Sequence, residues 1–183
     1  MNRRTAITAA LAGPAAAAAA DTWKDPFARE WRDSFLLHWR VTKDYTLAVL
    51  DAMPDSGWES KPNPAQRPFW EQLVHLGRAN VAYMTAFNVR KPPEPPKGSV
   101  RAEVRSYLSA TFDYVTEVIG LIGENELRRR DLQFNSRVKP HSGTDLFMRA
   151  YMHTAHHRGQ AIVYLRVNGI APPTWAFEPT AHA

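Results

Sequence analysis

The 183-residue sequence contains no cysteine. This absence excludes disulfide bonds, thiolate metal sites, a cysteine nucleophile and a lipid-modified cysteine anchor. Any metal ion in this protein must therefore be held by nitrogen and oxygen ligands. The sequence also lacks a glycine-rich phosphate-binding loop and a dinucleotide-binding fingerprint.

A long apolar run and a strong excess of one charge are missing as well. No mature segment is long and apolar enough to cross a bilayer. The formal net charge is only +5, and the basic residues are scattered. The one tight run, Arg128-Arg129-Arg130, is interpreted as a solvated loop or helix end, with a phosphate-binding patch as the alternative. We therefore expect no nucleic-acid partner and no stable membrane anchor after cleavage of a leader.

The beginning of the chain has the layout of an export signal. Arg3 and Arg4 form a short positive region, and the alanine-rich stretch that follows, residues 6–20, ends in three alanines. The paired arginines resemble a twin-arginine leader, although two neighbouring positions depart from that motif. We expect residues 1–20 to be a signal peptide and residues 21–183 to be one periplasmic or secreted domain. A cytoplasmic protein with an alanine-rich tail is the alternative.

Apolar residues repeat at helical spacing in four long segments, 26–52, 68–89, 99–123 and 144–168. Proline and glycine separate the segments, Ser99 is expected to cap the third, and Gly169 follows the last. No strand pattern competes with these helices. The sequence therefore predicts an all-α domain built as a four-helix bundle. The long connections 54–67 and 124–143 are expected to be irregular and to cover its ends.

Histidines occur at a spacing suited to metal binding. His153 and His157 are four residues apart, so on a helix they leave the same face, within an apolar stripe. His75 lies on a core-facing stripe of the second segment and would complete a three-nitrogen set if the two helices are neighbours. Spacing alone leaves a hydrogen-bonded core pair as an equal alternative. The glutamate of the HExxH pattern is absent, which excludes a zincin-type protease.

These motifs together resemble the DinB/YfiT-like superfamily. The resemblance rests on Val74-His75-Leu76, on the HxxxHRGQ pattern of residues 153–160, on Tyr164-Leu165-Arg166, and on Gly169 with Pro172-Pro173. It implies an up-down-down-up four-helix bundle that is often dimeric. It also implies a divalent metal held by His75, His153 and His157. The superfamily name refers to DNA damage and gives no support for DNA binding.

Two ionisable residues near the expected ligands have open roles. Glu71 lies one turn before His75 and is the best-placed catalytic proton acceptor by spacing. A solvated carboxylate favoured by the helix N-terminus is the alternative. His156 is adjacent to His157 and projects about 100° away from it on a helix. A surface or interface histidine is therefore expected there in preference to a fourth ligand.

Four further residues are expected to support the ligands or to line the pocket: Tyr83, Arg158, Gln160 and Tyr164. Arg158 and Gln160 are carried over from the HRGQ motif. The two tyrosines have packing in the core as their alternative role.

Three functions remain open at this point. The first is a metal-dependent hydrolase or group transferase, because a divalent cation on three imidazoles makes water a better nucleophile. The second is a metal-binding module without catalysis, and the third is a helical scaffold. Some relatives in the resembled superfamily act on thiol adducts, but export separates a protein from reduced cytoplasmic thiols. Zinc, nickel, iron and manganese all accept imidazole. We expect a homodimer and an unspecified small-molecule substrate.

Overall fold

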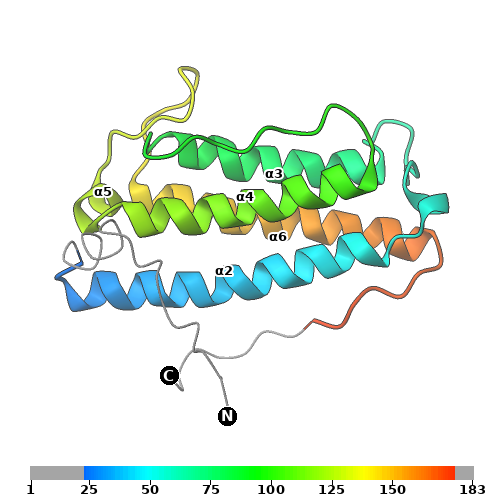
Figure 1. Ribbon diagram of the computed structural model, residues 1–183, viewed down its shortest axis with the longest axis horizontal. Coiled ribbons are helices and arrows are strands. Elements are labelled where there is room, and N and C mark those ends of the chain that lie inside the picture. The colour runs from blue at the N-terminus through cyan, green and yellow to red at the C-terminus, as the bar shows by residue number, and fades with distance from the viewer. Residues whose placement is uncertain (1–22, 176–183) are drawn as a thin grey trace, which may run out of the picture.

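The computed structural model describes residues 23–175, and this part of the chain is all-helical, as expected (Figure 1). The long helices are α2 (Pro26–Ala52), α3 (Phe69–Thr85), α4 (Arg101–Leu121) and α6 (Gly143–Val167), and the short ones are η1 (Asp55–Gly57) and α5 (Glu124–Arg128). No described helix is long and apolar enough to span a membrane. The expected signal peptide, residues 1–20, lies outside the described residues.

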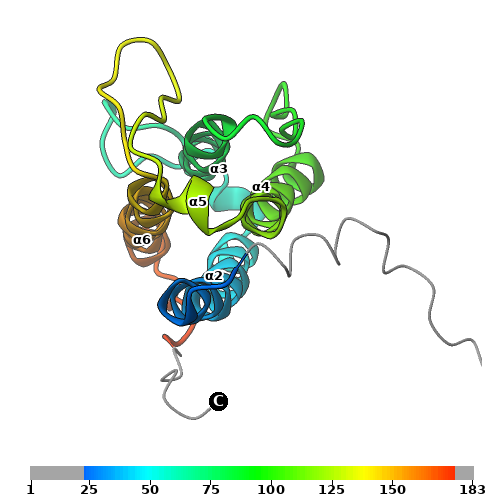
Figure 2. The same ribbon diagram turned by 90° about the vertical axis from the view of Figure 1, so that its left-hand side faces the viewer.

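The four long helices lie side by side, and both α2 and α3 pack against α4 and α6. Seen end-on in Figure 2, α3 and α2 therefore occupy opposite corners of the group. Along the chain, α2 and α6 run in one direction, while α3 and α4 run in the other (Figure 1). This arrangement places the middle of α3 directly beside the middle of α6.

Local chemistry accounts for several helix ends. The Asp25 carboxylate accepts a hydrogen bond from the Phe27 N–H at 2.9 Å, which caps α2. The Ser142 hydroxyl accepts one from the Asp145 N–H at 3.1 Å and caps α6. Gly169 follows α6 with φ +74°, the left-handed conformation that glycine adopts without steric cost.

Large aromatic side chains fill the space between the helices. Trp39 and Phe112 pack with ring centroids 4.8 Å apart, and the Trp39 indole N–H donates to the Phe112 carbonyl at 3.0 Å. Phe147 packs edge-on against Phe35 at 5.2 Å. Burial of this apolar surface is the main stabilising contribution and fixes how α6 lies on its neighbours.

The structure corrects three local expectations. The second helix ends at Thr85 and not at residue 89, because Phe87 turns into the core and Asn88 adopts a positive φ of 51°. The third helix begins at Arg101 without a side-chain cap, so the expected Ser99 cap is wrong. The Ser99 carbonyl instead accepts a hydrogen bond from the Trp58 indole at 2.6 Å.

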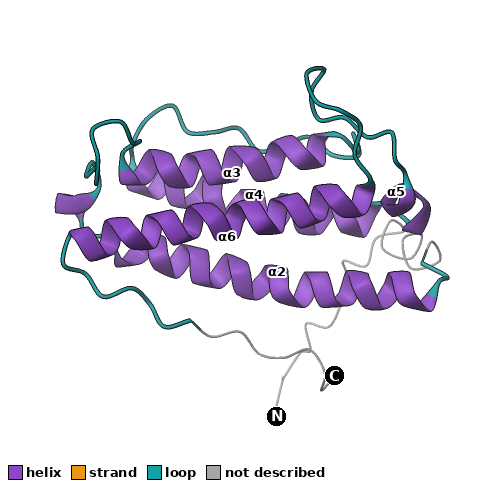
Figure 3. Ribbon diagram, turned by 180° about the vertical axis from the view of Figure 1, so that it is seen from behind, coloured by secondary structure: helices purple, strands orange, loops and turns teal. Residues whose placement is uncertain are grey.

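The connection 124–143, expected to be irregular, is partly ordered. Its first residues form α5, which is anchored by the buried side chain of Leu127. Leu132 and His141 then form two antiparallel backbone hydrogen bonds, of 3.2 and 2.8 Å, at the base of a projecting loop. Figure 3 shows this loop rising beyond the bundle at the end where α5 lies.

Candidate metal centre

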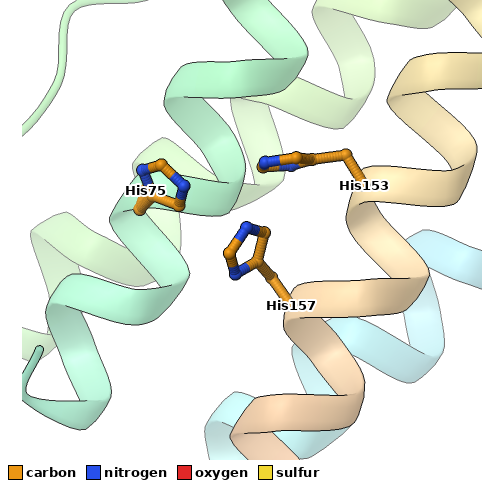
Figure 4. A group of neighbouring side chains, drawn as sticks. All are labelled: His75, His153 and His157. Atoms are coloured by element: carbon orange, nitrogen blue, oxygen red, sulfur yellow. The ribbon is translucent and has the colours of Figure 1, made fainter. Parts of the chain in front are cut away.

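Three histidines converge between α3 and α6 (Figure 4). His75 comes from the middle of α3, and His153 and His157 come from successive turns of α6. One nitrogen from each ring lies within 4.8 Å of the others. The ring centroid of His157 lies 4.2 Å from that of His153 and 4.6 Å from that of His75. The three residues that the sequence predicts as ligands are therefore brought together.

The surroundings keep these imidazoles neutral. Burial, with a smaller contribution from the neighbouring histidines, lowers the pKa of His153 and of His157 to about 4. Burial also lowers the pKa of His75, with a smaller contribution from Arg67 and Arg78. Neutral imidazole has a nitrogen lone pair available for a metal ion, whereas imidazolium has none.

The residues fit a divalent transition metal. The Nδ1 atom of His153 is buried and has no hydrogen-bond partner among residues 23–175, which is costly unless another group contacts this ring. Two nitrogens on one zinc ion are at most about 4.2 Å apart. The ligand atoms of the three rings lie within 4.8 Å of one another, which is close to this limit.

Gln72 is a site residue that the sequence analysis missed. Its side-chain amide is buried on α3 and its Nε2 lies 2.6 Å from His157 Nδ1. It also contacts Gln160 Oε1, which lies 3.2 Å from the same His157 nitrogen. These contacts leave His157 Nε2 to face the other two rings. Gln72 precedes His75 by three residues, and this shared helix face is the signal that could have identified it.

The remaining polar groups of the HRGQ motif point in different directions. His156 is exposed, and its Nε2 lies 2.9 Å from Gln160 Nε2. Arg158 is buried against α2, where its guanidinium lies 3.4 Å from Thr46 Oγ1 and 5.0 Å from the Tyr45 ring centroid. Gln160 thus contacts the histidine cluster, whereas Arg158 joins α6 to α2.

The two tyrosines differ in their positions. The Tyr83 ring lies 6.0 Å from the His153 ring and 5.1 Å from that of Phe134, which comes from the projecting loop. Burial raises the pKa of Tyr83, so it remains a neutral phenol. Tyr164 is buried, and its hydroxyl donates to the Arg67 carbonyl at 2.7 Å. Tyr164 therefore holds the connection that precedes α3.

Glu71 lies at the edge of this region. Its half-exposed carboxylate is 3.9 Å from Arg67 Nε. It also acts on His75, since its negative charge is the one influence that raises the pKa of that imidazole. The carboxylate is thus held by a weak ion pair beside the histidine cluster, which leaves it accessible to water.

Comparison with known family models shows which family the chain belongs to. The model of the DinB superfamily matches residues 38–161, a range that contains all three clustered histidines. The chain belongs to the DinB superfamily. No curated protein matches it.

Two solved structures have the same fold. A DinB-like protein from Bacillus cereus is 18% identical, with a TM-score of 0.69 over 79% of this chain and 97% of that one. A DinB-like protein from Bacillus subtilis is 16% identical, with a TM-score of 0.62 over 78% of this chain and 96% of that one. At these identities the likeness shows the fold alone.

Proposed function

We propose that this DinB-superfamily protein binds a divalent transition metal through His75, His153 and His157, and that the site serves a hydrolase or group transferase. The observation that carries the proposal is the convergence of three neutral imidazoles from two helices. The helices α2 and α6 run opposite to α3 and α4, which supports the expected up-down-down-up bundle. In this bundle α3 and α6, the two helices that carry the histidines, are neighbours.

The protein supplies binding and proton-transfer groups around the cluster. A bound divalent ion would act as a Lewis acid toward a substrate oxygen and would promote water as a nucleophile. His75 and His153 are only partly buried, so part of the cluster is exposed to solvent. The Tyr83 phenol can donate a hydrogen bond beside His153, and Glu71 is the candidate proton acceptor. Imidazole ligands suit zinc, nickel, iron and manganese.

An activity panel tests the catalytic part of the proposal. Protein loaded separately with each of the four metals is assayed with ester, amide and thiol-adduct substrates. We expect turnover that requires the metal, is abolished by His75→Ala and is reduced at least tenfold by Glu71→Gln. Glu103→Gln, which changes an exposed glutamate on α4, is the matched control and should leave the rate unchanged. Uniform inactivity of stoichiometrically loaded protein favours the non-catalytic metal-binding module.

A homodimer is proposed as the assembly. Met148, Met152 and Val163 are 43%, 61% and 47% exposed and lie along one outward face of α6. Exposed apolar side chains that cluster in this way are typical of protein interfaces. Met152→Glu should convert a dimer to a monomer in sedimentation experiments, and a wild-type monomer at all concentrations would contradict the proposal.

Export is proposed on the basis of residues 1–20, which lie outside the described residues. Cell fractionation tests it with the full-length chain and with Arg3→Lys/Arg4→Lys, because twin-arginine export depends on the paired arginines. Mature protein outside the cytoplasm is the expected result, and full-length protein in the cytoplasm would contradict it.

A further inference from the structure

We infer that Gln72 and Gln160 form an amide relay that determines which nitrogen of His157 is available to a metal; this inference rests on the proposed metal site. The relay connects four side chains in series. His157 Nδ1 lies 2.6 Å from Gln72 Nε2, Gln72 contacts Gln160 Oε1, and Gln160 Nε2 lies 2.9 Å from His156 Nε2. It therefore runs from the centre of the histidine cluster to the surface of α6.

The direction of the hydrogen bonds fixes the tautomer of His157. An amide N–H beside Nδ1 at 2.6 Å requires Nδ1 to accept, because two N–H donors cannot face each other. The neutral ring then has its proton on Nε2, the nitrogen that faces His75 and His153. With this direction of the relay, His157 cannot give a lone pair to the ion through Nε2.

The opposite direction produces the metal-binding tautomer. A half-turn of the Gln72 amide places its oxygen against Nδ1, which then carries the proton and donates it. Gln160 must turn as well, because two amide oxygens would otherwise face each other. After both turns the Gln160 oxygen accepts from His156 Nε2–H. The contacts of Gln72 with His157 and with Gln160, and of Gln160 with His156, are then all donor–acceptor pairs. Nε2 of His157 has its lone pair directed toward the other two rings.

Burial makes the relay specific to these side chains. Gln72 is 3% exposed, so water cannot readily replace its amide at His157. His156 is exposed, so water can substitute at the outer end. Loss of the Gln72 amide, which accepts the hydrogen bond from His157 Nδ1–H, should therefore weaken metal binding strongly. Loss of the His156 ring should weaken it little. Gln72 and Gln160 act through His157, and are positioning residues.

The test measures zinc affinity of the untagged protein by competition with a chromophoric chelator. Gln72→Met keeps the length of the side chain but removes the acceptor, and should weaken zinc binding about 10- to 100-fold. Gln72→Glu supplies a carboxylate, which can only accept, and should retain or exceed wild-type affinity. Gln66→Met, at an exposed position in the connection before α3, is the matched control and should bind zinc as the wild type does.

A second readout follows the tautomer directly. Nitrogen-15 NMR of zinc-loaded wild type should show His157 with a protonated Nδ1 and a metal-bound Nε2. If Gln72→Met fails to fold by circular dichroism, Gln160→Met replaces it and should also weaken zinc binding, because methionine cannot donate a hydrogen bond to the Gln72 oxygen. Gln160→Glu should weaken zinc binding as well, because its carboxylate would place an oxygen against that oxygen. Wild type that binds no zinc removes the proposed metal site and the relay with it. Zinc-binding wild type with unweakened methionine variants, or with metal on His157 Nδ1, overturns the relay alone.

Discussion

The ring of His75 lies 4.6 Å from the ring of His157, although the two residues belong to different helices. This contact exists because the middle of α3 packs against the middle of α6. The same packing buries His157 and partly buries His75, and this burial lowers the pKa values of both rings. Helix packing therefore creates the cluster and also keeps its nitrogens available for a metal.

The metal-free protein should lose stability as the pH falls from 6.5 to about 4. Unfolded histidines protonate near 6.5, whereas burial lowers the pKa of folded His153 and His157 to about 4. Between these values the unfolded state binds more protons, so acidification favours unfolding. Below about 4 both states are protonated and this dependence ends. Urea unfolding across the window measures the free energy of unfolding at each pH.

The control for this prediction is the double variant His153→Gln/His157→Gln. Without the two buried imidazoles, the free energy of unfolding should vary less with pH over the same window. A pH dependence as steep as that of the wild type would show that other groups cause the acid sensitivity.

Two glycines of α6 should respond in opposite ways to alanine. A Cβ at Gly143 would lie 2.5 Å from the Glu126 carbonyl oxygen and 2.6 Å from that of Leu127, so Gly143→Ala should destabilise the fold by about 1–3 kcal/mol. A Cβ at Gly159 would meet no described atom within 4 Å, and helix propensity then predicts that Gly159→Ala stabilises by about 1 kcal/mol. Thermal melts of dilute protein measure both, and shifts of the same sign would contradict this description.

Tyr164→Phe should weaken the fold without emptying the site. The substitution removes the hydrogen bond from the hydroxyl to the Arg67 carbonyl, which is 2.7 Å long. The loss should cost about 1 kcal/mol of the free energy of unfolding. Metal content of the folded variant should equal that of the wild type, because Tyr164 holds a connection and not a ligand. A large drop in metal content would instead assign this tyrosine to the site.

Much of the architecture was predictable because helical periodicity is a local property of the sequence. The spacing of apolar residues placed α2 at the residues where it lies, and it placed the start of α6 within one residue. The end of α3 was not predictable, because Phe87 leaves the helix to pack against Phe147, with ring centroids 5.4 Å apart, a contact made by tertiary structure. The short helix α5 was missed for the same reason, since the buried Leu127 anchors it.

The residues of the candidate site were also predictable only in part. The four-residue spacing of His153 and His157 shows that they share a face, and the pattern around His75 added the third histidine. The spacing of Gln72 and His75 indicates a shared helix face, but the contact of Gln72 with His157 depends on the approach of α3 to α6 across the helix interface. The ion pair of Glu71 with Arg67 and the position of Tyr83 beside the projecting loop also depend on that packing.

Elemental analysis of untagged protein measures whether the three clustered histidines hold a metal ion. We expect about one divalent transition-metal ion per chain for the wild type, as a three-histidine site requires. His75→Ala and His157→Ala should lower this content sharply, whereas His156→Ala should lower it much less, because its ring lies outside the cluster. Wild-type protein without stoichiometric metal, or equal losses in all three variants, would contradict a metal site formed by His75, His153 and His157.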